Sequence, residues 1–113
     1  MYKILCLLSM LLLIGCGSSV PQKCLIYDSG EQTFKYIKLQ TDEALQALVN
    51  VYQKNDSILV KEQCKAPKGF YGEYGFLMMQ RGQNDEGRQL MRKEIENYPE
   101  SQTFMLRALG EKE

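Results

Sequence analysis

Cysteine is the residue type in this chain whose position most clearly indicates a chemical modification. Cys16 directly follows Leu13-Ile14-Gly15, which closes an apolar stretch that begins soon after Lys3. A positive residue, an apolar run and a small residue before a cysteine are typical of a bacterial lipoprotein signal peptide. We therefore predict cleavage before Cys16 and attachment of a thioether-linked diacylglycerol to the Cys16 sulfur, with a further acyl chain on the freed amine.

A membrane-spanning or buried helix is the alternative interpretation of the same N-terminal segment. The apolar run covers residues 4–14, whereas a helix needs about 20 apolar residues to cross a bilayer. We therefore favour an anchored chain over a spanning one. Two or three acyl chains, at about 0.8 kcal/mol per buried CH₂, hold a protein firmly at a membrane.

The residues after the predicted cleavage site indicate where the protein is sorted. Gly17, rather than aspartate, follows Cys16, and this favours the periplasmic face of the bacterial outer membrane. We expect residues 1–15 to be the signal peptide and residues 16–23 to be the lipidated cysteine with a flexible tether. Residues 24–113 then form a single small domain.

The other cysteines form one possible disulfide. Cys6 leaves with the signal peptide and Cys16 is acylated, so only Cys24 and Cys64 remain. An oxidising compartment favours a bond between them, and closing a loop of about 40 residues stabilises a fold by about 4 kcal/mol on the chain-entropy account. Two unpaired, partly buried thiols are the alternative, and we favour the disulfide.

The composition argues against catalysis and against nucleic-acid binding. The chain has no histidine, which removes the commonest general base and metal ligand. Its 14 basic and 14 acidic residues balance, without a block of charge that would attract nucleic acid. We predict no enzymatic activity, no catalytic or metal site, no cofactor and no small-molecule substrate. We interpret the following carboxylates as solvated charges on helix surfaces: Glu73, Asp85, Glu86, Glu94 and Glu96.

The periodicity of apolar residues predicts helices. Thr41 is suited to cap a helix whose apolar residues recur at steps of three and four, and Asn55-Asp56-Ser57 is expected to end it. Residues 57–68 are expected to be irregular or helical. Further along, Gly82 fits the left-handed position that follows a helix, and Pro99 stops the next helix. A last short helix is expected to carry Phe104, Met105, Ala108 and Leu109.

The predicted helix-turn-helix hairpin at residues 69–99 resembles one tetratricopeptide unit. Tyr71 occupies the aromatic position, Gly75 the close-packing position, Gly82 the turn and Pro99 the closing position. Glu94 departs from the pattern, because a small residue is expected there. A single unit cannot bury its own apolar face, so neighbouring helices or a partner must cover it.

Several segments resemble one family of small lipoproteins, described as domain of unknown function 4810. The resemblance rests on the lipobox, on residues 66–77, on Gln80-Arg81-Gly82 and on the stretch from Arg92 to Ser101. It implies an all-α outer-membrane lipoprotein without established enzymatic activity, and it favours a helix over residues 34–39. It also implies a gene often found beside that of a curli-secretion-channel-like lipoprotein.

These observations lead to two hypotheses of function. In the first, the protein is a lipid-anchored binding or assembly subunit of an envelope complex, with the channel-like lipoprotein as a candidate partner. Apolar residues exceed what one helix face can hold around Phe76 and Met79, so we expect those two side chains on the partner surface. In the second, it is a structural or stress-related envelope lipoprotein without a fixed protein partner.

Overall fold

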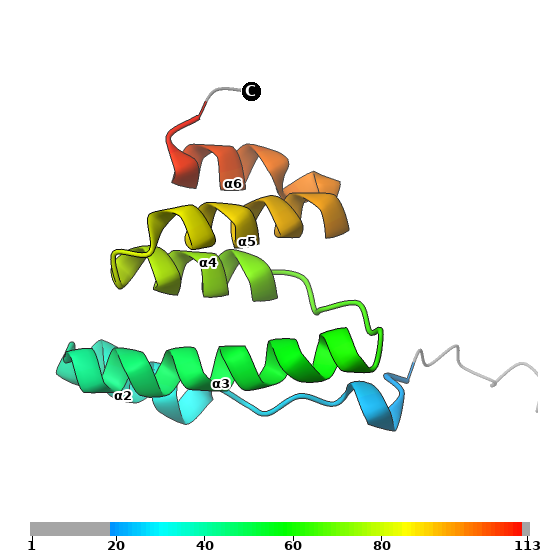
Figure 1. Ribbon diagram of the computed structural model, residues 1–113, viewed down its shortest axis with the longest axis horizontal. Helices are drawn as coiled ribbons and strands as arrows, with labels where there is room; N and C mark the ends of the chain where they lie inside the picture. The colour runs from blue at the N-terminus through cyan, green and yellow to red at the C-terminus, as the bar shows by residue number, and fades with distance from the viewer. Residues whose placement is uncertain (1–18, 112–113) are drawn as a thin grey trace, which may run out of the picture.

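The computed structural model describes residues 19–111, and these form an all-α fold (Figure 1). The predicted signal peptide and Cys16 lie outside the described residues. The helices stack in layers, with α2 and α3 in one layer followed in order by α4, α5 and α6. Their bounds are η2 Gln22–Cys24, α2 Gly30–Leu39, α3 Asp42–Lys61, α4 Phe70–Gln80, α5 Asn84–Asn97, η3 Pro99–Ser101 and α6 Gln102–Leu109. The predicted all-α class and the helix over residues 34–39 are confirmed.

Helix α3 begins where the sequence predicts and ends later than expected. The Thr41 hydroxyl accepts a hydrogen bond from the Ala44 amide at 3.2 Å, which caps the helix. Asn55 and Asp56, expected to end the helix, lie inside it and use their side chains for tertiary contacts. The Asn55 amide exchanges two 2.8 Å hydrogen bonds with the backbone of Tyr27. Because these side chains bond to other segments, they leave the helix backbone intact as far as Lys61.

The segment from residue 57 to residue 68 therefore divides into two parts. Its first residues complete α3, and a turn at Gln63, with φ of +54°, then directs the chain toward α4. The Tyr98 hydroxyl donates a 2.6 Å hydrogen bond to the Ala66 carbonyl, which fixes this connection against the end of α5. Gly69, with φ of +93°, leads into α4.

Helices α4 and α5 form the predicted helix-turn-helix hairpin. Gly82 has φ of +82°, and the amides of Gly82 and Gln83 donate to the carbonyls of Met79 and Met78 at 2.9 and 3.0 Å. This pair of bonds is the Schellman arrangement, which satisfies the last carbonyls of a helix. A Cβ placed on Gly75 would lie 2.6 Å from the Gly87 carbonyl oxygen, so glycine is what lets the two helices approach.

Two apolar clusters hold the fold together. The larger joins α3 to α4 and includes the packed rings of Tyr52, Phe70 and Tyr74. The smaller joins α5 to α6 through Met91, Met105 and Leu109. The last short helix is present as α6, where Met105, Leu106 and Leu109 are buried while Phe104 and Ala108 are exposed. Helix α2 has no buried residue at all.

Candidate functional site: an apolar groove over helix α4

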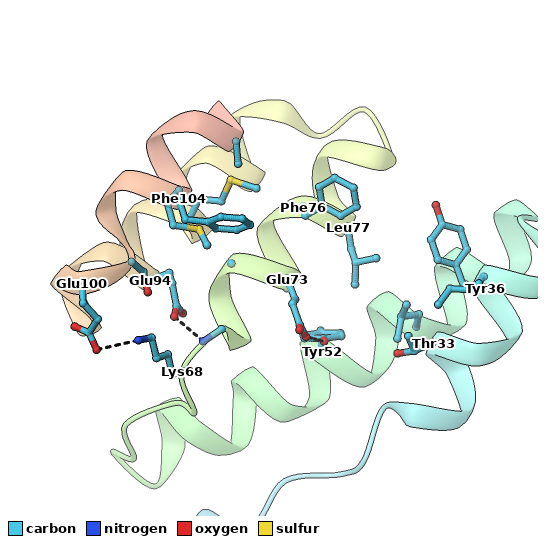
Figure 2. Close-up of a pocket in the computed structure, with 18 residues that line it drawn as sticks. Thr33, Tyr36, Tyr52, Lys68, Glu73, Phe76, Leu77, Glu94, Glu100 and Phe104 are labelled. Carbon is cyan, nitrogen blue, oxygen red and sulfur yellow. Dashed lines mark hydrogen bonds and ion pairs between the residues drawn. The ribbon is translucent and has the colours of Figure 1, made fainter. Parts of the chain in front are cut away.

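An open groove of about 830 Å³ crosses the molecule over helix α4 (Figure 2). Helices α2 and α3 supply one side, and α6 with η3 supplies the other. Its lining is mostly apolar and includes Tyr36, Ile37, Leu48, Tyr52, Phe76, Leu77, Met91, Phe104, Met105 and Ala108. The size and apolar character of this groove are those of a binding site.

Three exposed side chains from three different helices give the groove its apolar surface. They are Ile37 on α2, Phe76 on α4 and Phe104 on α6, with 65%, 52% and 70% of their surface exposed. Gly72 lies between them on α4, and a Cβ at this position would come within 2.7 Å of Met105 Cε. The lack of a side chain at Gly72 therefore lets the Met105 side chain reach from α6 to α4 at the groove floor.

A tyrosine–carboxylate pair lies in the polar part of the groove wall. The Tyr52 hydroxyl donates a 2.5 Å hydrogen bond to Glu73 Oε2. Burial, and then the bond to this carboxylate and its charge, raise the pKa of Tyr52 to about 12. Tyr52 is therefore a neutral donor at physiological pH, and it holds Glu73 at the edge of an apolar surface.

Glu94 has a role that the sequence interpretation missed. Its side chain is fully buried, with 0% exposed, although we expected a solvated surface charge. Its Oε1 accepts from the Gly69 amide at 2.6 Å and its Oε2 from the Tyr71 amide at 3.2 Å. Gly69 has no side chain to cap α4, so the carboxylate from α5 serves as the cap at the positive end of the α4 dipole. A small residue at position 94 could not reach these two amides, so the cap requires a long acidic side chain.

The other carboxylates behave as surface charges. Asp85, Glu86 and Glu96 are exposed, as expected, and Glu73 is exposed but hydrogen bonded to Tyr52. Within residues 19–111 no group of three or more potential metal ligands comes together. The groove is therefore better described by its apolar surface than by any cluster of reactive groups.

The structure separates the two residues predicted for a partner surface. Phe76 lies in the groove, whereas Met79 is half-buried and packs between α4 and α5 against Gly87 and the cluster around Met91. Met79 fills the space left by the missing side chain at Gly87, so less of it than of Phe76 is open to a partner, and its place on a partner surface stays a prediction. Ile37 and Phe104 lie in the groove with Phe76, and the sequence did not single them out for a partner surface because periodicity does not show which helix face is covered.

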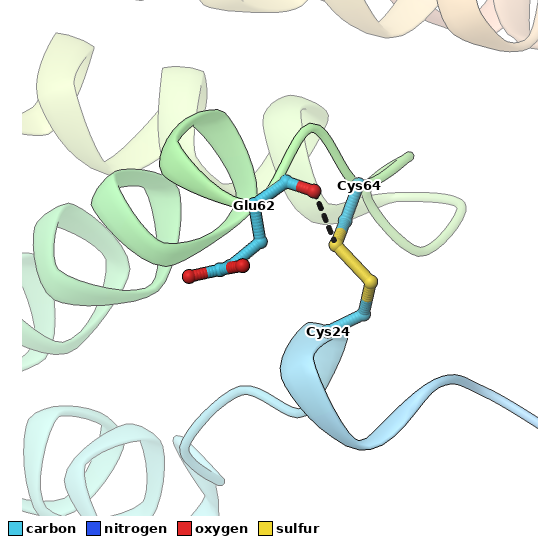
Figure 3. The surroundings of a disulfide bond; sticks show 3 residues. All are labelled: Cys24, Glu62 and Cys64. Atoms are coloured by element: carbon cyan, nitrogen blue, oxygen red, sulfur yellow. Dashed lines mark hydrogen bonds between the residues drawn. A yellow bond between two sulfur atoms is a disulfide. The ribbon is translucent and has the colours of Figure 1, made fainter.

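Cys24 and Cys64 are joined by a disulfide, with their Cα atoms 5.8 Å apart (Figure 3). The bond ties η2 to the chain just after α3. The Glu62 carbonyl oxygen lies 3.5 Å from Cys64 Sγ, and this is a packing contact because an oxidised sulfur has no hydrogen to donate. The predicted tether therefore ends at a fixed point on the folded domain.

The fold and the groove define a small all-α protein with an apolar surface site. The chain belongs to the family described as Domain of unknown function (DUF4810), whose model matches residues 26–107. The matched range includes the α-helices described between residues 19 and 111, except the last residues of α6. No curated protein and no solved structure matches the chain. The likeness of its hairpin to a tetratricopeptide unit stays a prediction from sequence.

Between residues 19 and 111, no helix combines the length and the apolar character needed to cross a membrane.

Proposed function

We propose that this protein is a lipid-anchored, periplasm-facing lipoprotein of the outer membrane that acts as a non-enzymatic binding or assembly subunit of an envelope complex. The observation that carries this proposal is the groove over α4, where Ile37, Phe76 and Phe104 are all exposed. Apolar side chains gathered in one groove favour association, because a partner that covers them removes apolar surface from water. This burial contributes a favourable free energy of about 25 cal/mol per Å².

The lipid anchor supports the same proposal by restricting where the groove can act. Seven tether residues, 17–23, reach at most about 25 Å when fully extended. The disulfide at Cys24 then fixes the end of the tether to the domain. The groove therefore meets partners that are themselves in or near the membrane. The family resemblance makes a channel-forming, curli-secretion-like lipoprotein the first partner to examine.

Crosslinking in intact cells tests the binding role. A photoreactive amino acid replaces Phe76 or Phe104 in the groove, and in a control variant it replaces Val60, which is also exposed but lies outside the groove. We expect the groove positions, and not residue 60, to capture the same envelope protein reproducibly, as identified by mass spectrometry. Recovery of no protein from either groove position would favour the structural or stress-related alternative.

Metabolic labelling tests the anchor independently. We expect a palmitate analogue to label the wild-type protein, and the Cys16→Ser variant to lose the label and leave the membrane fraction. The anchor proposal is wrong if the variant keeps the label.

A further inference from the structure

The groove is built entirely from helices and from the loop before α4, and this limits the backbone of any occupant. Helical backbone groups are satisfied within each helix, so the walls offer few donors or acceptors to a bound chain. An extended peptide would place its own amides and carbonyls unpaired against an apolar surface, which is unfavourable for each group left without a hydrogen bond. A helix satisfies these groups internally. The groove therefore favours a helical occupant.

The charges around the groove indicate what the occupant carries beside its apolar face. The carboxylate and ammonium side chains that line the groove are Lys68, Glu73, Glu94 and Glu100. Two of the carboxylates have hydrogen-bond or ion-pair partners within the protein. Glu94 is bonded to two amides, and Glu100 is paired with Lys68 at 3.3 Å. Glu73 has a hydrogen bond from Tyr52 but no ion-pair partner among residues 19–111. An unpaired carboxylate beside an apolar surface favours a cation on the occupant.

From these two observations we infer that the groove binds an amphipathic helix of the partner, with apolar residues at steps of three, four and seven and a lysine or arginine that meets Glu73. Helix-in-groove binding uses this spacing of anchors. The inference rests on the proposed binding function and specifies the chemistry of the partner at the same site.

Direct binding of designed helices tests the inference. The full mature protein is reconstituted in phosphatidylcholine nanodiscs, and binding of fluorescent peptides is followed by polarisation, with empty nanodiscs subtracted. One peptide has a leucine and phenylalanine face flanked by lysines, a second has glutamates at the flanks, and a third is a scramble of the first without an apolar face. We expect the lysine-flanked peptide to bind most tightly and the scramble to bind least.

Three variants locate the binding. Phe104→Ser removes an exposed apolar groove residue and is expected to weaken binding of the lysine-flanked peptide about tenfold or more, because aromatic side chains that become buried in an interface contribute much of its affinity. Glu73→Gln keeps an acceptor for Tyr52 and is expected to weaken the same peptide about fivefold, with little effect on the glutamate-flanked one. Val60→Ser, outside the groove, is expected to change neither. Circular dichroism verifies that each variant is folded.

The possible results separate this inference from the proposed function. Equal affinities for lysine- and glutamate-flanked peptides, or a scramble that binds as well, would overturn the inference. So would a wild-type protein that self-associates through the groove, seen as a dimer that Phe104→Ser converts to monomer, because the occupant would then be a second copy. The in-cell crosslinks from Phe76 and Phe104 test the proposed function whatever the designed peptides do.

Discussion

The cap that Glu94 provides for α4 yields a quantitative prediction. The carboxylate is fully buried and accepts from two backbone amides, of Gly69 and Tyr71. In Glu94→Gln one oxygen becomes an NH₂ group, which cannot accept, so at least one buried amide loses its partner. An unsatisfied buried donor costs about 1–3 kcal/mol, and the remaining bond loses its charge assistance. We expect Glu94→Gln to lower the free energy of unfolding by about 2–3 kcal/mol.

Urea unfolding followed by far-ultraviolet circular dichroism measures this loss, under oxidising conditions that keep the disulfide intact. Because about 1 kcal/mol lowers the melting temperature of a domain this small by about 4–8 °C, the variant should melt about 8–24 °C lower. Glu96→Gln is the matched control, since Glu96 is exposed on the same helix and its change should stay within about 0.5 kcal/mol. A Glu94→Gln variant as stable as this control would refute the capping role.

Three further predictions concern the fold. In Gly75→Ala the new methyl group would meet a carbonyl oxygen of α5 at 2.6 Å, so we expect a loss of about 1–3 kcal/mol in urea unfolding as the helices separate. Replacing both Cys24 and Cys64 by serine opens a crosslink of sequence separation 40, and the expected loss is about 4 kcal/mol, measured in the same way. Tyr52→Phe should reduce the loss of folding stability at alkaline pH. The pKa of Tyr52 is raised to about 12 in the folded protein, so the unfolded chain loses the hydroxyl proton near pH ~10 while the folded chain keeps it. The free energy of unfolding of the wild type therefore falls between about pH 10 and pH 12.

Each of these has a result that would contradict it. A Gly75→Ala variant with wild-type stability would show that α4 and α5 can separate freely. A double serine variant as stable as the oxidised wild type would mean that the crosslink adds nothing to the fold. An unchanged slope of stability against pH between about 10 and 12 in Tyr52→Phe would show that Tyr52 does not control this dependence.

Local signals in the sequence were sufficient where the backbone itself sets the structure. Gly82 and Pro99 marked the ends of α4 and α5, because a left-handed turn and a missing amide hydrogen act on their immediate neighbours. Thr41 likewise marked the start of α3 through its own hydroxyl. Such features can be predicted from a single chain.

Apart from the disulfide, which cysteine counting predicted, features that depend on contacts between distant segments were missed. Asn55 was predicted to end a helix, because the sequence does not show that its side chain bonds to Tyr27, 28 residues away. Glu94 was predicted to be a solvated surface charge, because the amides to which it bonds are 23 and 25 residues away in the sequence. The groove itself was not predicted, and Phe76 is the one lining residue that was assigned to a partner surface. The walls of the groove come from α2, α3, η3 and α6, and no periodicity shows that these helices leave one face uncovered.

The position of the disulfide has a mechanical consequence for an anchored protein. With the chain held at Cys16, as we propose, tension on the anchor passes along the tether to Cys24 and crosses the sulfur–sulfur bond to Cys64. It then enters the connection to α4. Helices α2 and α3 lie in the loop that this bond closes, and so they are outside the path that carries the load. Tension on the lipid anchor would therefore not extend the α2 side of the groove. Reduction of the Cys24–Cys64 disulfide would instead place both α2 and α3 in the path of that tension.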